Sequence, residues 1–261
     1  MRVIGVIPAR MGSSRFPGKP LARIHGVPMA GHVYFRSKMS RLLQEVYIAT
    51  CDEPIRAYAE QIGAPCILTA ATHERAVDRT VEANATVEAM TGRRSDIVVM
   101  IQGDEPMVRP EMIDEAVAPL LADPAILLVN LTAPLKDREE HADPNAVKVV
   151  MDQAGDALYF SREPIPSWKK GAAALPMWKQ VCIMPFRRDF LVTFGRLPQT
   201  PLERAESVDM LRALEHGYRV RMVPTRHDTY CVDTPEDLAR AERKMAKDPL
   251  VARYRQAAGA K

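Results

Sequence analysis

Short apolar runs alternate with stretches of helical periodicity along the first half of the chain. The runs at 3–7, 46–50, 65–69 and 97–101 are apolar and mostly rich in β-branched residues, as expected of strands buried on both faces of a parallel sheet. Segments with helical spacing lie at 29–43, 53–62, about 80–90 and 110–122. This alternation predicts an α/β fold with a doubly wound, mostly parallel sheet, whose ligands bind beyond the carboxyl ends of the strands.

The second half has a less regular pattern. Strands are expected at 126–132, in 143–151, in 157–162, at 179–191 (running into a helix) and at 219–223. Apolar residues recur every three positions over 201–216, which predicts one helix ended by Gly217. Asp233 or Thr234 is expected to cap a last helix that begins at Pro235, and the tail beyond about Asp248 is expected to be frayed.

The loop after the first strand combines small and basic residues. Gly12, Ser13 and Ser14 let backbone N–H groups approach an oxyanion closely. Three cations, Arg10, Arg15 and Lys19, supply the charge that phosphate oxygens need. The pattern predicts a polyphosphate clamp, and the alternative interpretation is a solvated basic loop.

A second chemical signal follows the most apolar strand, 97–101. Gly103 permits a sharp turn, and Asp104 then stands at the end of a central strand, where a carboxylate beside a triphosphate favours Mg²⁺. Capping of the following helix is the competing role, and Glu111 or Asp114 suits that role better.

Composition narrows the class of protein. The chain has 261 residues, 47% hydrophobic and 26% charged, which fits one soluble α/β domain with room for a small lobe. A net charge of +3 gives no nucleic-acid footprint, and no apolar run is long enough to span a membrane. The four dispersed cysteines suggest reduced thiols without a zinc site, so we expect a cytoplasmic protein.

Several of these stretches resemble one family. The loop matches PAR-x-x-S-x-R-x-PGKPL, the signature of sugar nucleotidyltransferases and in particular of cytidylyltransferases that activate sugar acids. QGDEP (102–106), DPNAVKVV (143–150), ALYFSR (157–162) and VDTPEDL (232–238) match as well. Over roughly residues 3–245 the chain is similar to the CMP-Kdo synthetase family, the 3-deoxy-manno-octulosonate (Kdo) cytidylyltransferases. A further motif, H-x-S-G-T-D/E-R, is matched only in part, by His73, Asp78 and Arg79.

The resemblance implies a Rossmann-like nucleotidyltransferase domain over 1–261, with an inserted lobe at about 133–200 for acceptor binding and dimerisation. It implies transfer of CMP from CTP to an acidic acceptor with release of pyrophosphate, carried out by Arg10, Arg15, Lys19 and Asp104. Mg²⁺ would be held by Asp104 and Asp233. Nucleotide contacts are expected from Pro8, Ala9, Arg10, Gly12, Ser13, Ser14, Lys19, His73, Asp78, Arg79, Gln102 and Gly103.

The acceptor half departs from the family pattern. Gln180, Met184 and Phe186 stand where the family has a His and two Tyr, and Asp209-Met210 replaces a Glu-Gln pair. Arg75 is either a surface substitution or an added ligand for a more anionic substrate. The expected acceptor contacts are Arg75, Gln102, Lys148, Arg162, Gln180, Met184, Phe186, Glu206, Asp209 and Met210.

Three functional hypotheses therefore stay open at the level of sequence. The acceptor is Kdo or a Kdo-like sugar acid, or else a smaller anion such as a phosphonate that needs fewer hydroxyl partners. A nucleotide-binding paralogue without turnover is the third, and retention of both presumed metal carboxylates argues against it. The preference for cytidine rests on the family alone, because the loop reads phosphates.

Overall fold

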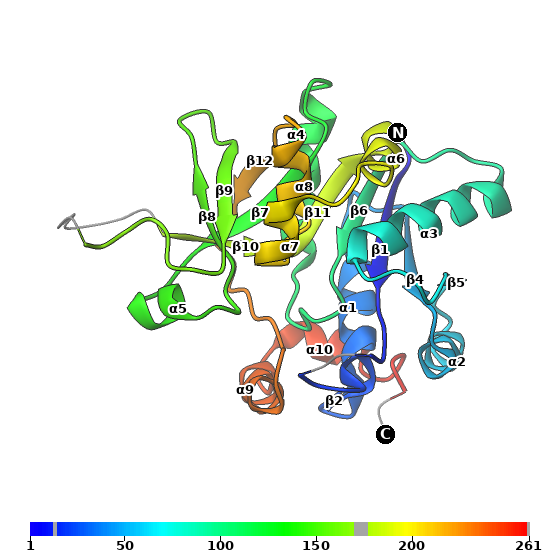
Figure 1. Ribbon diagram of the computed structural model, residues 1–261. Coiled ribbons are helices and arrows are strands. Elements are labelled where there is room, and N and C mark those ends of the chain that lie inside the picture. Colours follow the sequence, from blue (N-terminus) through cyan, green and yellow to red (C-terminus); the bar gives the residue numbers. More distant parts are fainter. Residues whose placement is uncertain (13–14, 170–176, 260–261) are drawn as a thin grey trace. The chain divides into compact units, whose positions relative to one another are not determined.

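The computed structural model describes residues 1–12, 15–169 and 177–259 (Figure 1). The chain divides into two compact units, residues 1–114 with 229–261 (unit 1) and residues 115–228 (unit 2). The segment 133–200, expected as an acceptor lobe, lies within unit 2. No helix in the described part of the chain is long and apolar enough to cross a membrane.

Unit 1 is built on parallel strands in the order β6-β1-β4-β5. These strands are β1 (Val3–Pro8), β4 (Glu45–Thr50), β5 (Cys66–Leu68) and β6 (Ile97–Ile101). Every residue of β6 is buried, as its unbroken apolar run predicts. A parallel sheet within an α/β fold is thus confirmed.

Unit 1 also contains helices, some of which pack on this sheet. They are α1 (Met29–Ser37), α2 (Glu53–Gln61), α3 (Ala76–Thr91), α4 (Pro110–Ala122), α9 (Pro235–Met245) and α10 (Pro249–Tyr254), and the division between the units falls within α4. The long helix α3 packs along β1, β4, β5 and β6 (Figure 1). A 3-10 turn, η1 (Lys19–Leu21), and a small hairpin, β2 (Arg23–Ile24) with β3 (Val27–Pro28), precede α1.

The C-terminal segment is packed, so the expectation of a frayed tail beyond Asp248 was wrong. Tyr254 of α10 is 3% exposed, and its hydroxyl lies 2.7 Å from Nδ1 of the buried His32. The guanidinium of Arg36, also buried, donates to Asp248 Oδ2 at 2.7 Å. These are contacts across more than 200 residues of sequence, which local pattern does not reveal.

Unit 2 carries a mixed sheet in the order β12-β7-β10-β8-β9, in which only β12 and β7 pair in parallel among the described strands. Its elements are β7 (Val129–Pro134), α5 (Arg138–Ala142), β8 (Lys148–Met151), β9 (Ala157–Ser161), β10 (Trp178–Val181), β11 (Ile183–Arg187), α6 (Arg188–Phe194), α7 (Pro201–Glu206), α8 (Met210–Glu215) and β12 (Arg221–Pro224).

The single helix expected over 201–216 is two helices, α7 and α8. They are separated at Ser207, whose φ of 53° is left-handed. The guanidinium of Arg162 donates hydrogen bonds to the main-chain carbonyls of Glu206 and Ser207 at 2.6 and 3.4 Å. These carbonyls therefore bond to a side chain from a distant segment of unit 2. A tertiary contact therefore overrides a clear helical period.

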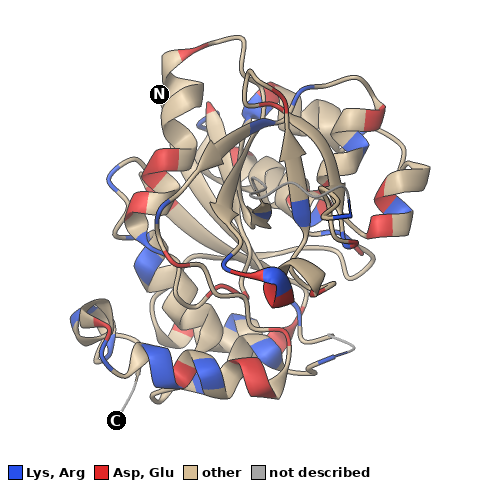
Figure 2. Cartoon of the chain, turned by 90° about the vertical axis from the view of Figure 1, so that its left-hand side faces the viewer, with Lys and Arg blue, Asp and Glu red and all other residues tan. Residues whose placement is uncertain are grey.

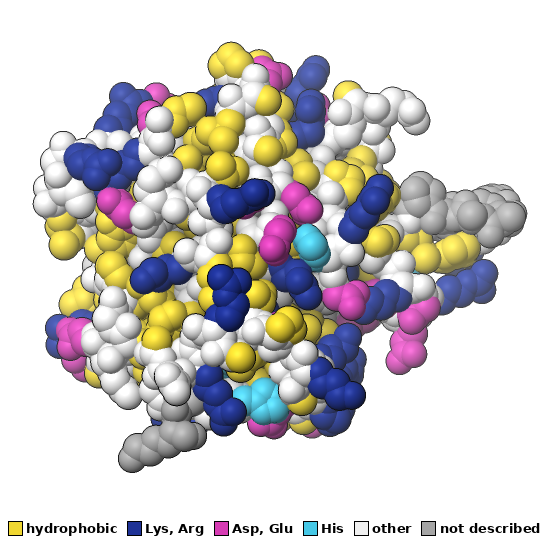
Figure 3. Space-filling view, turned by 180° about the vertical axis from the view of Figure 1, so that it is seen from behind, with side chains coloured by type: hydrophobic (Ala, Val, Ile, Leu, Met, Phe, Trp, Pro, Cys, Tyr) yellow, Lys and Arg dark blue, Asp and Glu magenta, His cyan; other side chains and the backbone are white. Residues whose placement is uncertain are grey.

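Charged side chains of both signs occur together on the helices. Along α9, for example, Glu236 and Asp237 in the first turn are followed by Arg243 and Lys244 in the last (Figure 2), an arrangement that complements the helix dipole. On the face in Figure 3, Lys and Arg side chains lie among acidic and apolar ones.

Candidate active site

The carboxyl ends of β1 and β6 lie side by side in unit 1, where Val6 pairs with Met100. A Cβ atom at Gly103, directly after β6, would lie 3.3 Å from the carbonyl oxygen of Pro8. Glycine permits this close approach of the two chain segments. The turn thus brings Asp104 beside the loop that leaves β1, as the sequence predicts for ligand-binding groups of an α/β sheet.

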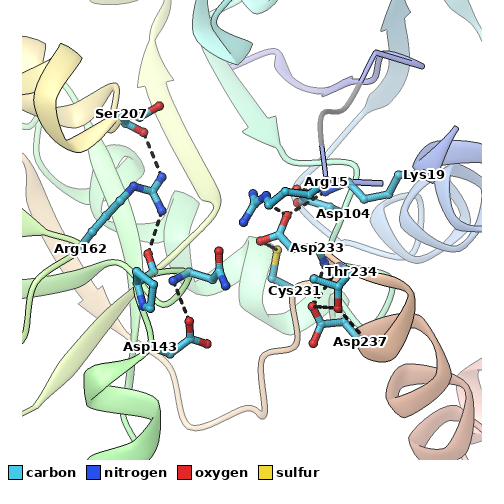
Figure 4. A network of polar contacts seen from close by, with 12 residues as sticks. Arg15, Lys19, Asp104, Asp143, Arg162, Ser207, Cys231, Asp233, Thr234 and Asp237 are labelled. Atoms are coloured by element: carbon cyan, nitrogen blue, oxygen red, sulfur yellow. Dashed lines mark hydrogen bonds and ion pairs between the residues drawn. The ribbon is translucent and has the colours of Figure 1, made fainter. Parts of the chain in front are cut away.

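Lys19 lies between two carboxylates at this edge. Its Nζ is 3.0 Å from Asp104 Oδ2 and 3.1 Å from Asp233 Oδ1 (Figure 4). Arg15 donates to the same oxygen of Asp233 at 3.0 Å. Gly18, with a left-handed φ of 75°, and Pro20 form the turn that presents Lys19. The structure therefore brings together four of the residues predicted from sequence.

Local bonds explain how Asp233 reaches this place from a distant part of the chain. The N–H of Val232 donates to the carbonyl of Asp104 at 2.9 Å. Thr234, not Asp233, caps α9: its hydroxyl accepts from the N–H of Asp237, and the Asp237 carboxylate accepts from the N–H of Thr234. The Asp233 carboxylate is thereby left for Arg15 and Lys19.

The charges of this cluster are coupled. Burial alone lowers the pKa of Lys19, but the negative charges of Asp104 and Asp233 outweigh it and raise the pKa above its ordinary value. Asp104 Oδ1 is buried and has no hydrogen-bond partner among the described residues. A buried carboxylate oxygen without a donor is costly, and a bound cation would satisfy it. The donor set thus suits a divalent cation.

Asp52 is a functional candidate that sequence reasoning missed. Its Oδ2 accepts from the N–H of Met11 at 2.8 Å, and Gly18 N–H closes the loop onto the carbonyl of Met11 at 3.0 Å. Its position directly after β4, at the same sheet edge, was an available signal. Of the predicted loop contacts, Arg10 and Gly12 are exposed, and Ser13 and Ser14 lie outside the described residues.

The motif before α3 is held by protein groups. Arg79 is 3% exposed; it donates to the hydroxyl of Thr69 and, at 3.5 Å, to Cys51 Sγ. The His73 ring bonds to Glu82. Arg75 is the N-cap residue of α3, and Asp78 lies in its first turn. Nucleotide or acceptor contacts by these residues, and by the partly exposed Gln102, stay predictions.

In unit 2, Lys148 and Arg162 bond to the main chain. The ammonium of Lys148 is buried and donates to the carbonyls of Asp143, at 2.8 Å, and Arg162. Burial lowers its pKa below the ordinary value. The guanidinium of Arg162 donates to the carbonyls of Pro144 and Glu206 at 2.9 and 2.6 Å (Figure 4 shows its neighbours). Two cations thus join three segments of the unit.

Glu206 completes this arrangement. Its carboxylate accepts from the Ser161 hydroxyl at 2.9 Å, the Arg162 N–H at 2.7 Å and the Tyr159 hydroxyl at 3.3 Å. Asp209 and Met210, two further expected acceptor contacts, begin α8 directly beyond. The position of this segment therefore depends on Lys148 and Arg162, whether or not either touches a ligand.

The remaining expected acceptor residues lie on β10 and β11. The Gln180 amide donates to Asn130 Oδ1 at 2.6 Å and lies 3.9 Å from Met184 Sδ. Phe186 packs its ring against Phe194 at 5.7 Å between centroids. Phe186 and Met210 have no exposed surface here, so acceptor contacts by them stay predictions.

Known proteins resemble this chain over most of its length. The family profile described as Cytidylyltransferase matches residues 4–222. The 3-deoxy-manno-octulosonate cytidylyltransferase of Geobacter metallireducens is 43% identical over 257 residues, covering 95% of this chain and 99% of the relative. The Solibacter usitatus protein of that name is 46% identical over 242 residues, covering 93% and 94%. The chain belongs to the CMP-Kdo synthetase family of cytidylyltransferases.

Solved structures place the fold in the same family. A CMP:2-keto-3-deoxy-manno-octonic acid synthetase, solved as a complex with CTP, superposes with a TM-score of 0.86 at 38% identity, covering 95% of this chain and all of the other. A cytidylyltransferase from Leptospira borgpetersenii, with a TM-score of 0.64 at 17% identity, shares the fold. The family predicted from the motifs is confirmed, and so is its class of enzyme, nucleotidyltransferases that act as cytidylyltransferases.

Proposed function

We propose that this cytidylyltransferase transfers CMP from CTP to Kdo and releases pyrophosphate, with Mg²⁺ as the metal ion. The acceptor is the substrate named for relatives that match 93–95% of the chain. The observation that carries the chemistry is the meeting of Lys19, Asp104 and Asp233 at the end of the parallel sheet.

The proposed reaction forms one bond and breaks one. An acceptor hydroxyl oxygen attacks the α-phosphorus of CTP and its proton passes to solvent. The bond from that phosphorus to the bridging oxygen of the β-phosphate breaks, and pyrophosphate leaves with its electron pair. No protein nucleophile is needed, and the site's work is positioning and charge neutralisation. When bound, Mg²⁺ supplies Lewis-acid stabilisation of phosphate oxygens, and Asp104 and Asp233 are the residues that would hold it.

Lys19 and Arg15 would neutralise the charge of the phosphates. Both cations contact carboxylates in the structure described here. A triphosphate offers the same kind of oxygen at higher charge, so we expect the two side chains to turn to the phosphates when CTP binds. Arg10, exposed on the same loop, adds a third cation.

The acceptor assignment is tested by pyrophosphate release. The full chain is assayed with CTP and Mg²⁺, and with Kdo or a small phosphonate as acceptor. Release with Kdo supports the proposal. Release with the phosphonate and not with Kdo would overturn the acceptor and leave cytidylyl transfer intact. No release with either acceptor would contradict the proposed transfer and leave CTP binding as the remaining function to test.

Assembly and location are further expectations of the family. We propose a homodimer formed through the region Asp143–Pro166, in the cytoplasm. Sedimentation equilibrium across a concentration series tests the first point: a mass near that of one chain at all concentrations would contradict it.

A further inference from the structure

A cysteine lies beside the proposed metal carboxylates. Cys231 Sγ donates to Asp233 Oδ2 at 3.7 Å, and Figure 4 shows its side chain next to that carboxylate. One atom from each of Asp104, Cys231 and Asp233 lies within 4.8 Å of the others. Although the residue as a whole is exposed, burial and the neighbouring carboxylates raise the pKa of the Cys231 thiol well above its ordinary value, so a cation that binds the sulfur must displace its proton.

The geometry suits a metal with sulfur affinity. Around a tetrahedral zinc ion, with bonds of about 2.0–2.3 Å, neighbouring ligand atoms lie about 3.5 Å apart. The spacing within 4.8 Å therefore requires only a small closing movement of three side chains. Asp104 Oδ1, buried and without a hydrogen-bond partner among the described residues, provides an oxygen that Lys19 leaves unused.

The donor set is unusual for magnesium. Mg²⁺ takes oxygen ligands and does not gain from a thiolate, whereas Zn²⁺, Cd²⁺ and Co²⁺ accept mixed oxygen and sulfur ligands. Protein sites with three such ligands keep an open position for substrate or water. Lys19, which now bridges the carboxylates, adds positive charge that any cation must overcome, and this limits affinity.

We propose that Asp104, Cys231 and Asp233 form a binding site for thiophilic divalent cations, in which Cys231 supplies a thiolate ligand. The site takes Zn²⁺, Cd²⁺ or Co²⁺ at the place where the proposed function puts Mg²⁺. The inference rests on that proposed function. A thiophilic cation bound there competes with Mg²⁺. Metal selectivity of this cytidylyltransferase then depends on one sulfur atom.

The test uses Co²⁺ and Cd²⁺ alone, added to the full-length protein, with absorption and calorimetry as readouts. The native chain is expected to show sulfur-to-cobalt charge-transfer absorption. Cys231→Ser should abolish it and weaken Cd²⁺ binding by more than about tenfold. Cys66→Ser, which removes a thiol on β5, is the matched control and should leave both readouts unchanged.

A second variant keeps the test independent of any effect on folding. Asp233→Asn retains the thiol but removes a carboxylate, and should also weaken Cd²⁺ binding while circular dichroism shows a native fold. Charge-transfer absorption that persists in Cys231→Ser overturns the inference. If that variant loses the band while no acceptor supports pyrophosphate release, the metal site stands and the proposed function fails.

Discussion

Lys19 of unit 1 and Lys148 of unit 2 differ in what their ammonium groups bind. Lys19 bonds to two side-chain carboxylates at the sheet edge, and those charges raise its pKa. Lys148 bonds to two main-chain carbonyls, and burial lowers its pKa. A cation paired with carboxylates can exchange them for phosphate, whereas one bound to carbonyls holds the chain path. We therefore expect the same residue type to serve ligand binding in one unit and architecture in the other.

The largest effect is expected at the carboxylates that Lys19 bridges. Asp104→Asn should lower kcat/KM for pyrophosphate release by about 10²–10³-fold. The substitution removes a charged group from the place where negative charge moves between phosphate oxygens during the reaction. Thermal stability should change little. The control is Glu111→Gln, an exposed carboxylate in the first turn of α4, which should keep full activity. Equal losses in both variants would contradict a special role for Asp104.

The architectural role of Lys148 predicts a loss of stability. Lys148→Met keeps an unbranched side chain of similar length but leaves the carbonyls of Asp143 and Arg162 without the ammonium that donates to them. We expect the free energy of unfolding to fall by about 1–3 kcal/mol in a urea titration. Lys169→Met, on the surface of the same unit, serves as the control. Unchanged stability with a raised KM for the acceptor would instead make Lys148 a ligand.

His32 of unit 1 is buried, like Lys148, and it makes stability depend on pH. Burial lowers the pKa of His32 from 6.5 to about 4. As pH falls, the unfolded chain therefore binds a proton at His32 before the folded chain does. The stability that comes from burying the neutral imidazole is complete above about pH 6.5 and is lost between pH 6.5 and 4. Urea titrations should show about 2 kcal/mol less stability at pH 5 than at pH 7 from this group. His32→Gln should flatten that part of the profile.

The smallest effect separates Thr234 from its neighbour Asp233. Thr234→Ala removes the N-cap of α9 and should cost about 1 kcal/mol of unfolding free energy. Asp233→Asn should leave the cap in place and reduce activity. The two variants are compared by thermal melting and by pyrophosphate release. Lost activity in Thr234→Ala together with lost stability in Asp233→Asn would show that the cap and the site are misassigned.

Elements with a local signal were predicted closely. The strand at 97–101 and the helix at 110–122 have the expected bounds, because an unbroken apolar run and a helical period decide them locally. The closeness of Asp104 to the loop that carries Lys19 was expected, because strand ends in a parallel sheet collect ligand-binding groups, and the two side chains are in contact.

The errors share a physical cause, which is bonding between distant segments. The helix expected over 29–43 ends at Ser37, and beyond it Asp114 accepts from the Ser40 hydroxyl and the Arg41 N–H. Arg162 similarly ends α7 early. Whether a lysine meets a carboxylate or a carbonyl is decided by such contacts too, so the roles of Lys19 and Lys148 looked alike in sequence.

The most direct test of the contrast between the units is CTP affinity, measured by calorimetry, for Lys19→Met and Lys148→Met beside the native chain. We expect Lys19→Met to weaken CTP binding by about 10- to 100-fold at native stability, since it removes a charge-assisted bond to phosphate. Lys148→Met should bind CTP as the native chain does at temperatures where it is folded. Native CTP affinity in Lys19→Met would contradict the assignment of this site to the nucleotide.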